Sequence, residues 1–141
     1  MNEMTNDCNK YFIAIDPGRE KTGLAIFLLT GKVIEHKIIA TKNLIQELSL
    51  FVERYNITLF VIGSGTSSKD KRKLLQENFS DIALVVVNEY RSTDEARKLY
   101  FKDNPPRGLK RLIPLGMQVP PVPVDDYAAI VIGKKYLQDK K

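Results

Sequence analysis

Cysteine and histidine are almost absent from this chain. Its 141 residues include one cysteine, one histidine and no tryptophan. Cys8 has no partner for a disulfide within the chain, and the clusters of cysteine or histidine that zinc prefers cannot be built. His36 lies in a run that alternates with the period of a strand, and we interpret it as a surface strand residue. A histidine-based metal site and a Ser-His-Asp triad are therefore poorly supported.

Long apolar runs are also missing. No run reaches the length needed to span a membrane. The first ten residues, MNEMTNDCNK, are polar and lack the apolar core of an export signal, so a cytoplasmic location is expected. We expect residues 1–10 to form a flexible tail and residues 11–141 to form one domain, because a chain of this length can bury a substantial core.

Basic residues outnumber acidic ones, 22 Lys and Arg against 17 Asp and Glu, for a formal net charge of +5. This balance suits a protein that binds nucleic acid or another polyanion, although moderately basic proteins of many kinds exist. Two internal groups of basic residues and one near the C-terminus stand out, and the last is consistent with a simple solubilising tail. The groups are Lys69, Lys71, Arg72 and Lys73; Arg107, Lys110 and Arg111; and Lys134, Lys135, Lys140 and Lys141.

The apolar pattern predicts an α/β fold with a mixed five-stranded sheet. Three strands with short connections form an antiparallel meander, and two later strands are separated by helices, so these should be parallel through right-handed crossovers. Helices should cover both faces. The predicted strands are 11–16, 22–29, 32–40, 58–63 and 82–87, the last two buried, and the predicted helices are 43–55, 69–79, one starting at 92–95, and 127–137.

Residues 104–124 hold six of the seven prolines. Proline lacks the backbone donor and restricts the residue before it, so this segment cannot be a regular helix. It is too apolar for a free linker. We interpret it as an ordered or semi-ordered active-site loop.

Acidic side chains lie where predicted elements begin or end. Asp16 ends the first strand at the Pro17-Gly18 turn, and Glu89 follows the fifth strand. If these two strands are parallel, both acids leave the sheet at the same edge, where Asp125 or Asp126 at the start of the last helix would join them. Three carboxylates without histidine are the ligands expected for Mg²⁺ or Mn²⁺. Two such ions about 4 Å apart can activate water and stabilise the leaving oxygen of a phosphodiester.

Each acid also has an ordinary structural interpretation. Asp16 can simply start a turn, Glu89 can be a surface acid, and Asp125 can be an N-cap that the helix dipole favours. The joint arrangement, together with the strand order, favours the metal site.

Three sequence blocks carry a resemblance to a known family. They are IAIDPGREKTGLAI, in which glycines follow the acid at two and seven residues; VVNEYRSTDEAR; and PVDDYAAIVI. In this order they resemble the YqgF (RuvX) type of Holliday junction resolvase, in the RuvC-like branch of the ribonuclease H-like superfamily. The resemblance covers residues 11–137 and implies a ribonuclease H-like nuclease domain.

The resemblance implies that Asp16, Glu89 and Asp125 are metal-binding catalytic acids, with Asp126 the alternative for the third. It implies a metal-dependent endonuclease acting on branched DNA or on precursor 16S ribosomal RNA, and the sequence does not choose between these substrates. Two positions depart from the family. Glu20 stands where a basic residue is common, and Ala128 stands where RuvC has a further acid, so a second metal would bind weakly.

The loop Gly63-Ser64-Gly65-Thr66 is most simply a turn between a strand and a helix, although glycine-rich turns can present donors to phosphate. Its position suggests contact with a nucleic-acid backbone. The full set of expected nucleic-acid contacts is Lys21, Ser64, Thr66, Lys69, Arg72, Arg91, Thr93, Arg97, Arg107, Lys110 and Arg111.

Two other functions remain open. A non-catalytic nucleic-acid-binding relative would keep the basic surface without cleavage. A sugar kinase or actin-like ATPase shares the fold, but that class normally needs two such domains around its nucleotide. A homodimer is also left open.

Overall fold

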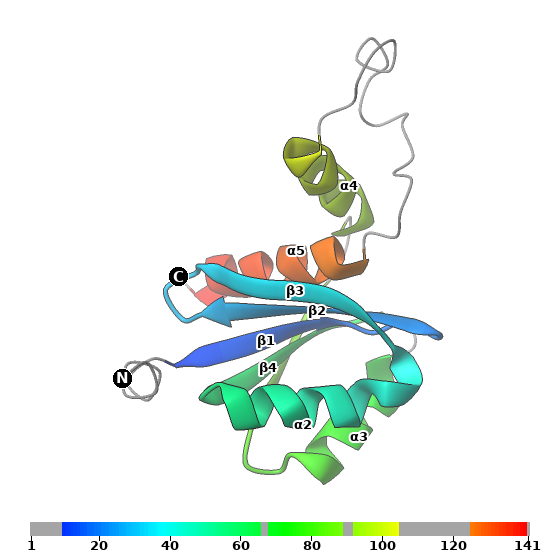
Figure 1. Ribbon diagram of the computed structural model, residues 1–141, viewed down its shortest axis with the longest axis vertical. Coiled ribbons are helices and arrows are strands. Elements are labelled where there is room, and N and C mark those ends of the chain that lie inside the picture. Colours follow the sequence, from blue (N-terminus) through cyan, green and yellow to red (C-terminus); the bar gives the residue numbers. More distant parts are fainter. Residues whose placement is uncertain (1–9, 66–67, 89–91, 105–124, 141) are drawn as a thin grey trace, which may run out of the picture.

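The computed structural model describes residues 10–65, 68–88, 92–104 and 125–140 (Figure 1). Several predicted features lie outside these ranges: the tail 1–9, most of the proline-rich segment, and the side chains of Thr66, Glu89, Arg91, Arg107, Lys110 and Arg111. Thr93 and Arg97 lie within a described helix, but their side chains are likewise outside the description.

One five-stranded sheet forms the centre of the described structure, with the strand order β3-β2-β1-β4-β5. β1 is antiparallel to β2, and β2 is antiparallel to β3, whereas β4 is parallel to both β1 and β5. The predicted mixed sheet is therefore confirmed. The strands are β1 Tyr11–Asp16, β2 Lys21–Leu28, β3 Val33–Ala40, β4 Ile57–Gly63 and β5 Ala83–Val87.

Helices cover both faces of this sheet, as predicted. α2 and α3 lie on one face, α5 lies on the other, and α4 packs on α5 (Figure 1). No helix in the described part of the chain is long and apolar enough to cross a membrane. The helices are the 3-10 helix η1 Thr41–Asn43, then α2 Leu44–Arg54, α3 Ser68–Asn78, α4 Ser92–Asp103 and α5 Asp125–Lys140.

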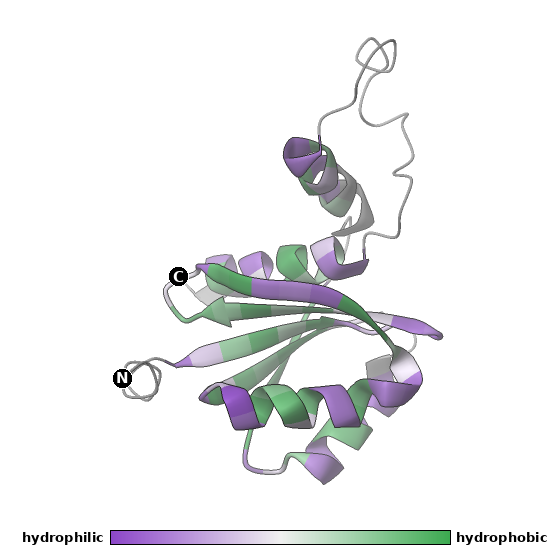
Figure 2. Cartoon of the chain, in the orientation of Figure 1, coloured by the Kyte–Doolittle hydropathy of each residue, from purple (hydrophilic) through white to green (hydrophobic). Residues whose placement is uncertain are grey.

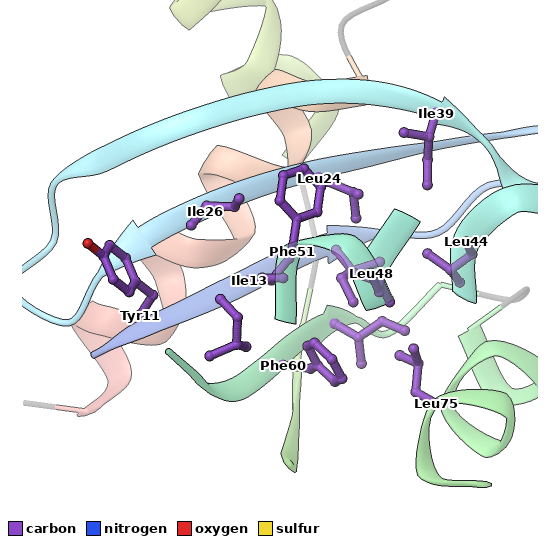
Figure 3. Close-up of a cluster of buried hydrophobic side chains, with 13 residues drawn as sticks. Tyr11, Ile13, Leu24, Ile26, Ile39, Leu44, Leu48, Phe51, Phe60 and Leu75 are labelled. Atoms are coloured by element: carbon purple, nitrogen blue, oxygen red, sulfur yellow. The ribbon is translucent and has the colours of Figure 1, made fainter. Parts of the chain in front are cut away.

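Two apolar cores arise from the alternation of side chains along the central strands. Ile13 and Phe60 face α2 and α3, where Leu48 and Phe51 are buried against them at helical spacing (Figure 3). Phe12 and its neighbours on the opposite face pack against α5. The strands between the helices are accordingly apolar along their length, whereas β3 carries several hydrophilic residues (Figure 2).

β5 corrects one expectation. The run 82–87 was expected to be buried, but β5 is the edge of the sheet, and Val86 is 41% exposed there. An apolar run reports hydrophobicity and does not reveal whether a second neighbouring strand exists. β4 is buried on both faces as predicted, because strands flank it on either side.

Helix α5 packs closely on the sheet at Gly133. A Cβ atom at this position would overlap the ring of Phe27 on β2. Glycine at this position therefore allows the helix to pack closely on the sheet. The helix begins at Asp125, two residues earlier than predicted, so Asp125 and Asp126 both lie in its first turn, where the helix dipole favours acids.

Candidate active site

Asp16 is the last residue of β1, and its side chain is partly buried. The turn that follows is tied to the end of β3. The hydroxyl of Thr41 donates to the carbonyl oxygen of Gly18 at 3.0 Å, and its backbone N–H donates to the carbonyl oxygen of Glu20 at 2.9 Å. The chain is thus fixed directly after Asp16.

A buried threonine completes this network. The hydroxyl oxygens of Thr22 and Thr41 lie 2.8 Å apart. Because the single hydroxyl proton of Thr41 is directed to Gly18, Thr22 is the donor in this pair. The sequence analysis assigned neither threonine to the site. Their signal was weak, since threonine is common in strands and at helix starts.

Gly23 allows the start of α5 to lie close to the end of β1. It pairs in register with Asp16 across β1 and β2. A Cβ atom at Gly23 would overlap the backbone carbonyl group of Asp125. Only glycine allows the helix to begin this close to the sheet. The motif glycine noted in the sequence therefore has a physical role, and it places Asp125 one strand from Asp16.

The environment of Asp125 shifts its protonation. Burial raises the pKa of its carboxyl group, the positive charge of Lys21 lowers it, and the negative charge of Asp126 raises it, with a net increase over the ordinary value. Lys21 is exposed at the start of β2. It was expected to contact nucleic acid, and in the structure its charge also acts on Asp125.

Asp126 makes different contacts from its neighbour. One carboxylate oxygen lies 2.7 Å from Nδ1 of His36 on β3, and the other accepts the backbone N–H of Tyr127 at 3.0 Å. The imidazole also packs against the Tyr127 ring, with centroids 5.2 Å apart. No hydrogen-bond partner for the Asp125 carboxylate lies among the described residues. His36 is indeed on a surface strand as expected, but its contact with Asp126 was not foreseen.

The sheet edge at which Glu89 was expected, where Asp16 also lies, is present in the structure. Val87, the last residue of β5, pairs with Gly63 at the end of β4, and Ile62 pairs with Ile15 just before Asp16. The chain therefore leaves β5 at the edge where Asp16 ends β1. Glu89 itself lies outside the described residues. Within those ranges, no three His, Cys, Asp or Glu side chains are grouped closely enough to hold a metal ion.

The described donors fit a hard divalent cation in their chemistry. Asp16 and Asp125 carry carboxylate groups, the backbone of Asp125 lies against the register partner of Asp16, and both residues are partly buried. Carboxylate oxygens suit Mg²⁺ or Mn²⁺. A carboxylate that is partly removed from water carries a charge that a cation would offset.

The expected nucleic-acid contacts are only partly grouped. Ser64 is exposed just after β4, and Lys69 is exposed in the first turn of α3, so both lie near the same sheet edge. Arg72 is partly buried, and its Nε atom has no hydrogen-bond partner in the described part of the chain. Lys21 lies beside Asp125, whereas the remaining candidates have side chains outside the description.

Comparison with known protein families gives a match. Residues 10–97, more than half of the chain, match the family profile described as the Tex protein YqgF-like domain. No match was found among curated protein sequences.

Three solved structures are similar to this chain, and the first of them shares its fold. The structure of RuvC from Thermus thermophilus is similar with a TM-score of 0.55 at 13% identity, over 92% of this chain and 95% of RuvC. A ROK family transcriptional regulator, a homologue of the E. coli MLC protein, has a TM-score of 0.47 at 17% identity, over 67% of this chain and 32% of its own. A sugar kinase described from Cytophaga hutchinsonii has a TM-score of 0.46 at 12% identity, over 62% of this chain and 38% of its own.

Proposed function

The chain belongs to the family of Tex protein YqgF-like domains, and from this premise we propose that it is a divalent-metal-dependent endonuclease that hydrolyses phosphodiester bonds in structured nucleic acid. One observation carries the proposal. The register partner of Asp16 is a glycine, and the absence of a side chain there lets the backbone of Asp125 lie against the sheet. This proximity of the two acidic residues, which are distant in the sequence, supports a site shared by their carboxylates at one corner of a ribonuclease H-like fold.

Asp16 and Asp125, with Glu89, would hold Mg²⁺ or Mn²⁺. When bound, such an ion lowers the pKa of water and offsets charge that develops on the phosphate. Asp126 is the less suitable ligand, because both of its oxygens are engaged by His36 and Tyr127.

The surrounding residues position these acids. The Thr41 hydrogen bonds fix the turn after Asp16, so that its carboxylate need not be ordered when substrate binds. Lys21 is exposed beside Asp125 and is available to a phosphate oxygen of the substrate. Partial burial of Asp16 and Asp125 would strengthen their attraction to a bound cation, since the local dielectric is lower than that of water.

We propose two substrates of the same chemical class: four-way DNA junctions, as in recombination, and precursor 16S ribosomal RNA. A cleavage panel tests the function directly. It compares a four-way junction, single-stranded DNA, duplex RNA and a ribosomal precursor, each with Mg²⁺, Mn²⁺ or excess chelator.

The matched variants in this panel are Asp16→Asn and Asp81→Asn. Asp81 is an exposed acid before β5, at the opposite end of that strand from the site. We expect Asp16→Asn to reduce cleavage by at least ~100-fold, the scale seen when one stabilising group is removed from a catalytic site. Asp81→Asn should cleave as the wild type does. Cleavage in excess chelator, or undiminished cleavage by Asp16→Asn, would contradict the proposal.

The alternative function is a nucleic-acid-binding relative without cleavage. Ala128, where RuvC has a further acid, favours this alternative, because fewer carboxylates hold fewer ions. Binding of a junction or structured RNA without cleavage of any substrate in the panel would support it.

A further inference from the structure

Two adjoining hollows lie where α4 packs on α5. The first has a volume of about 320 Å³ and lies between the two helices. The second has a volume of about 390 Å³ and extends to β3 at Val33, Ile34 and His36. Leu99 and Lys134 line both hollows, so the two hollows adjoin, and we call them together the α4–α5 groove.

Four lysines border the α4–α5 groove. Lys98 and Lys102 lie one helical turn apart on α4, and Lys134 and Lys135 lie on α5. Lys98, Lys102 and Lys134 are exposed. The acids that line the groove are Glu95 and Asp103, and Asp103 accepts a hydrogen bond from the Tyr127 hydroxyl at 3.1 Å. The border therefore has an excess of positive charge.

Apolar side chains lie between these lysines in both hollows. Leu99 and Val131 contribute to the first hollow, and Ile130 and the Tyr127 ring contribute to the second. Proteins that bind single-stranded nucleic acid combine this pair of features, since cations follow the phosphates and apolar or aromatic side chains accept the faces of bases. A groove between two packed helices admits one strand more readily than a duplex.

The second hollow of the groove reaches residues that contact the first turn of α5. Tyr127 and His36 line this hollow, and both contact Asp126 in the first turn of α5. Lys134 follows Tyr127 by seven residues on the same helix, about two turns and a rise of about 10 Å, so both lie on one face of α5 and line the second hollow. A strand that contacts Tyr127 can therefore continue along this face toward Lys134.

We propose that the α4–α5 groove binds a single-stranded arm of the nucleic-acid substrate, with Lys98, Lys102, Lys134 and Lys135 contacting its phosphates. This inference rests on the proposed function, because it extends the path of the same substrate. It also assigns a role to Lys134 and Lys135, which in the sequence resembled a solubilising tail.

The test measures binding without cleavage. Fluorescence anisotropy with a fluorescein-labelled 20-nucleotide poly(dT) is recorded in excess chelator over a range of NaCl concentrations. The test variant is Lys98→Ala/Lys134→Ala, and alanine should preserve both helices because its helix propensity is higher than that of lysine. For two lost contacts with a single strand, the plot of log affinity against log salt should flatten by about 1.4.

The matched control removes two charges elsewhere. Lys10 is exposed at the end of β1 away from Asp16, and Arg54 ends α2 on the opposite face of the sheet. The slope of Lys10→Ala/Arg54→Ala should equal that of the wild type, and thermal melts verify that both double variants fold. An unchanged slope in Lys98→Ala/Lys134→Ala, or an equal change in the control, would overturn the inference.

A competition experiment separates nucleic acid from an acidic protein segment. Unlabelled poly(dT) should displace the labelled strand at a lower concentration than a 20-residue polyglutamate. Equal displacement would overturn the assignment in favour of a generic acidic partner. The outcomes of the binding test and of the cleavage panel are independent. A flattened slope without cleavage of any substrate would support the groove as a binding site and contradict the nuclease function. Cleavage with an unchanged slope would support the nuclease function and contradict the role of the groove.

Discussion

Nδ1 of His36 lies 2.7 Å from Oδ2 of Asp126, although the two residues are 90 positions apart in the chain. This contact joins β3 to the first turn of α5 and directs the Asp126 carboxylate toward β3. The adjacent Asp125 lies instead against Gly23, the register partner of Asp16. Two consecutive acids that are equivalent in the sequence thus have different surroundings in the structure.

Asp125 should be the third metal ligand. Mg²⁺ at ten times its dissociation constant should stabilise the wild type by about 1.4 kcal/mol, because it binds only the folded state. Thermal melts with and without Mg²⁺ measure this effect. Asp125→Asn should lose most of the stabilisation, and Asp126→Asn should retain it. Loss in Asp126→Asn alone would assign the role to Asp126 instead.

Gly23→Ala should displace the start of α5. The added methyl group overlaps the Asp125 backbone, and such overpacking typically costs 1–3 kcal/mol, that is, about 2 kcal/mol of folding free energy. Gly133→Ala is the matched control, because its methyl group would overlap Phe27 away from the acids. Denaturant unfolding should show both variants destabilised. Only Gly23→Ala should also lose the Mg²⁺-dependent increase in melting temperature, and an equal Mg²⁺ response in both would refute a link between Gly23 and the site.

Asp125 should make the metal-free protein less stable at neutral pH. Its pKa is raised in the folded state, so the folded protein holds the proton more tightly than the unfolded chain does. The protonated Asp125 carboxyl group contributes favourably to the free energy of unfolding at pH values below its pKa in the unfolded chain. This contribution is lost as the pH rises through its pKa in the folded protein. Asp125→Asn should therefore melt at a higher temperature than the wild type at pH 7 in chelator. This advantage should shrink as the pH falls through the raised pKa, and a pH-independent difference would argue against a charge effect.

Thr41→Val should weaken the fixation of the turn after Asp16. The variant leaves the carbonyl of Gly18 and the hydroxyl of Thr22 without this partner, at a cost of roughly 1–3 kcal/mol. Thr58→Val is the control, since Thr58 donates a similar bond to the Tyr11 carbonyl at 3.2 Å, at the opposite end of β1. Cleavage rates should fall in Thr41→Val beyond what its stability loss explains. A comparable fall in Thr58→Val would indicate a general effect of stability.

The sequence by itself determined the type and order of the elements. The alternation and length of its apolar runs predicted five strands, and the short connections predicted which of them are antiparallel. Asp16 could be assigned to a strand end because Pro17 and Gly18 follow it, and Asp125 to a helix start because an apolar helical pattern begins beyond it. These signals are local, since each depends on the backbone preferences of a few consecutive residues.

Only the tertiary structure decided which of these residues meet. β5 has the apolar composition of a central strand, yet it is an edge strand, because no further strand pairs with it in the described sheet. The contact of His36 with Asp126, the approach of Asp125 to Gly23 and the α4–α5 groove each join elements distant in sequence. The periodicity of apolar residues indicates which side of a segment is buried. It does not specify the element that packs against that side. The partners follow from the packing of α5 on the sheet, which depends on the absence of side chains at Gly23 and Gly133.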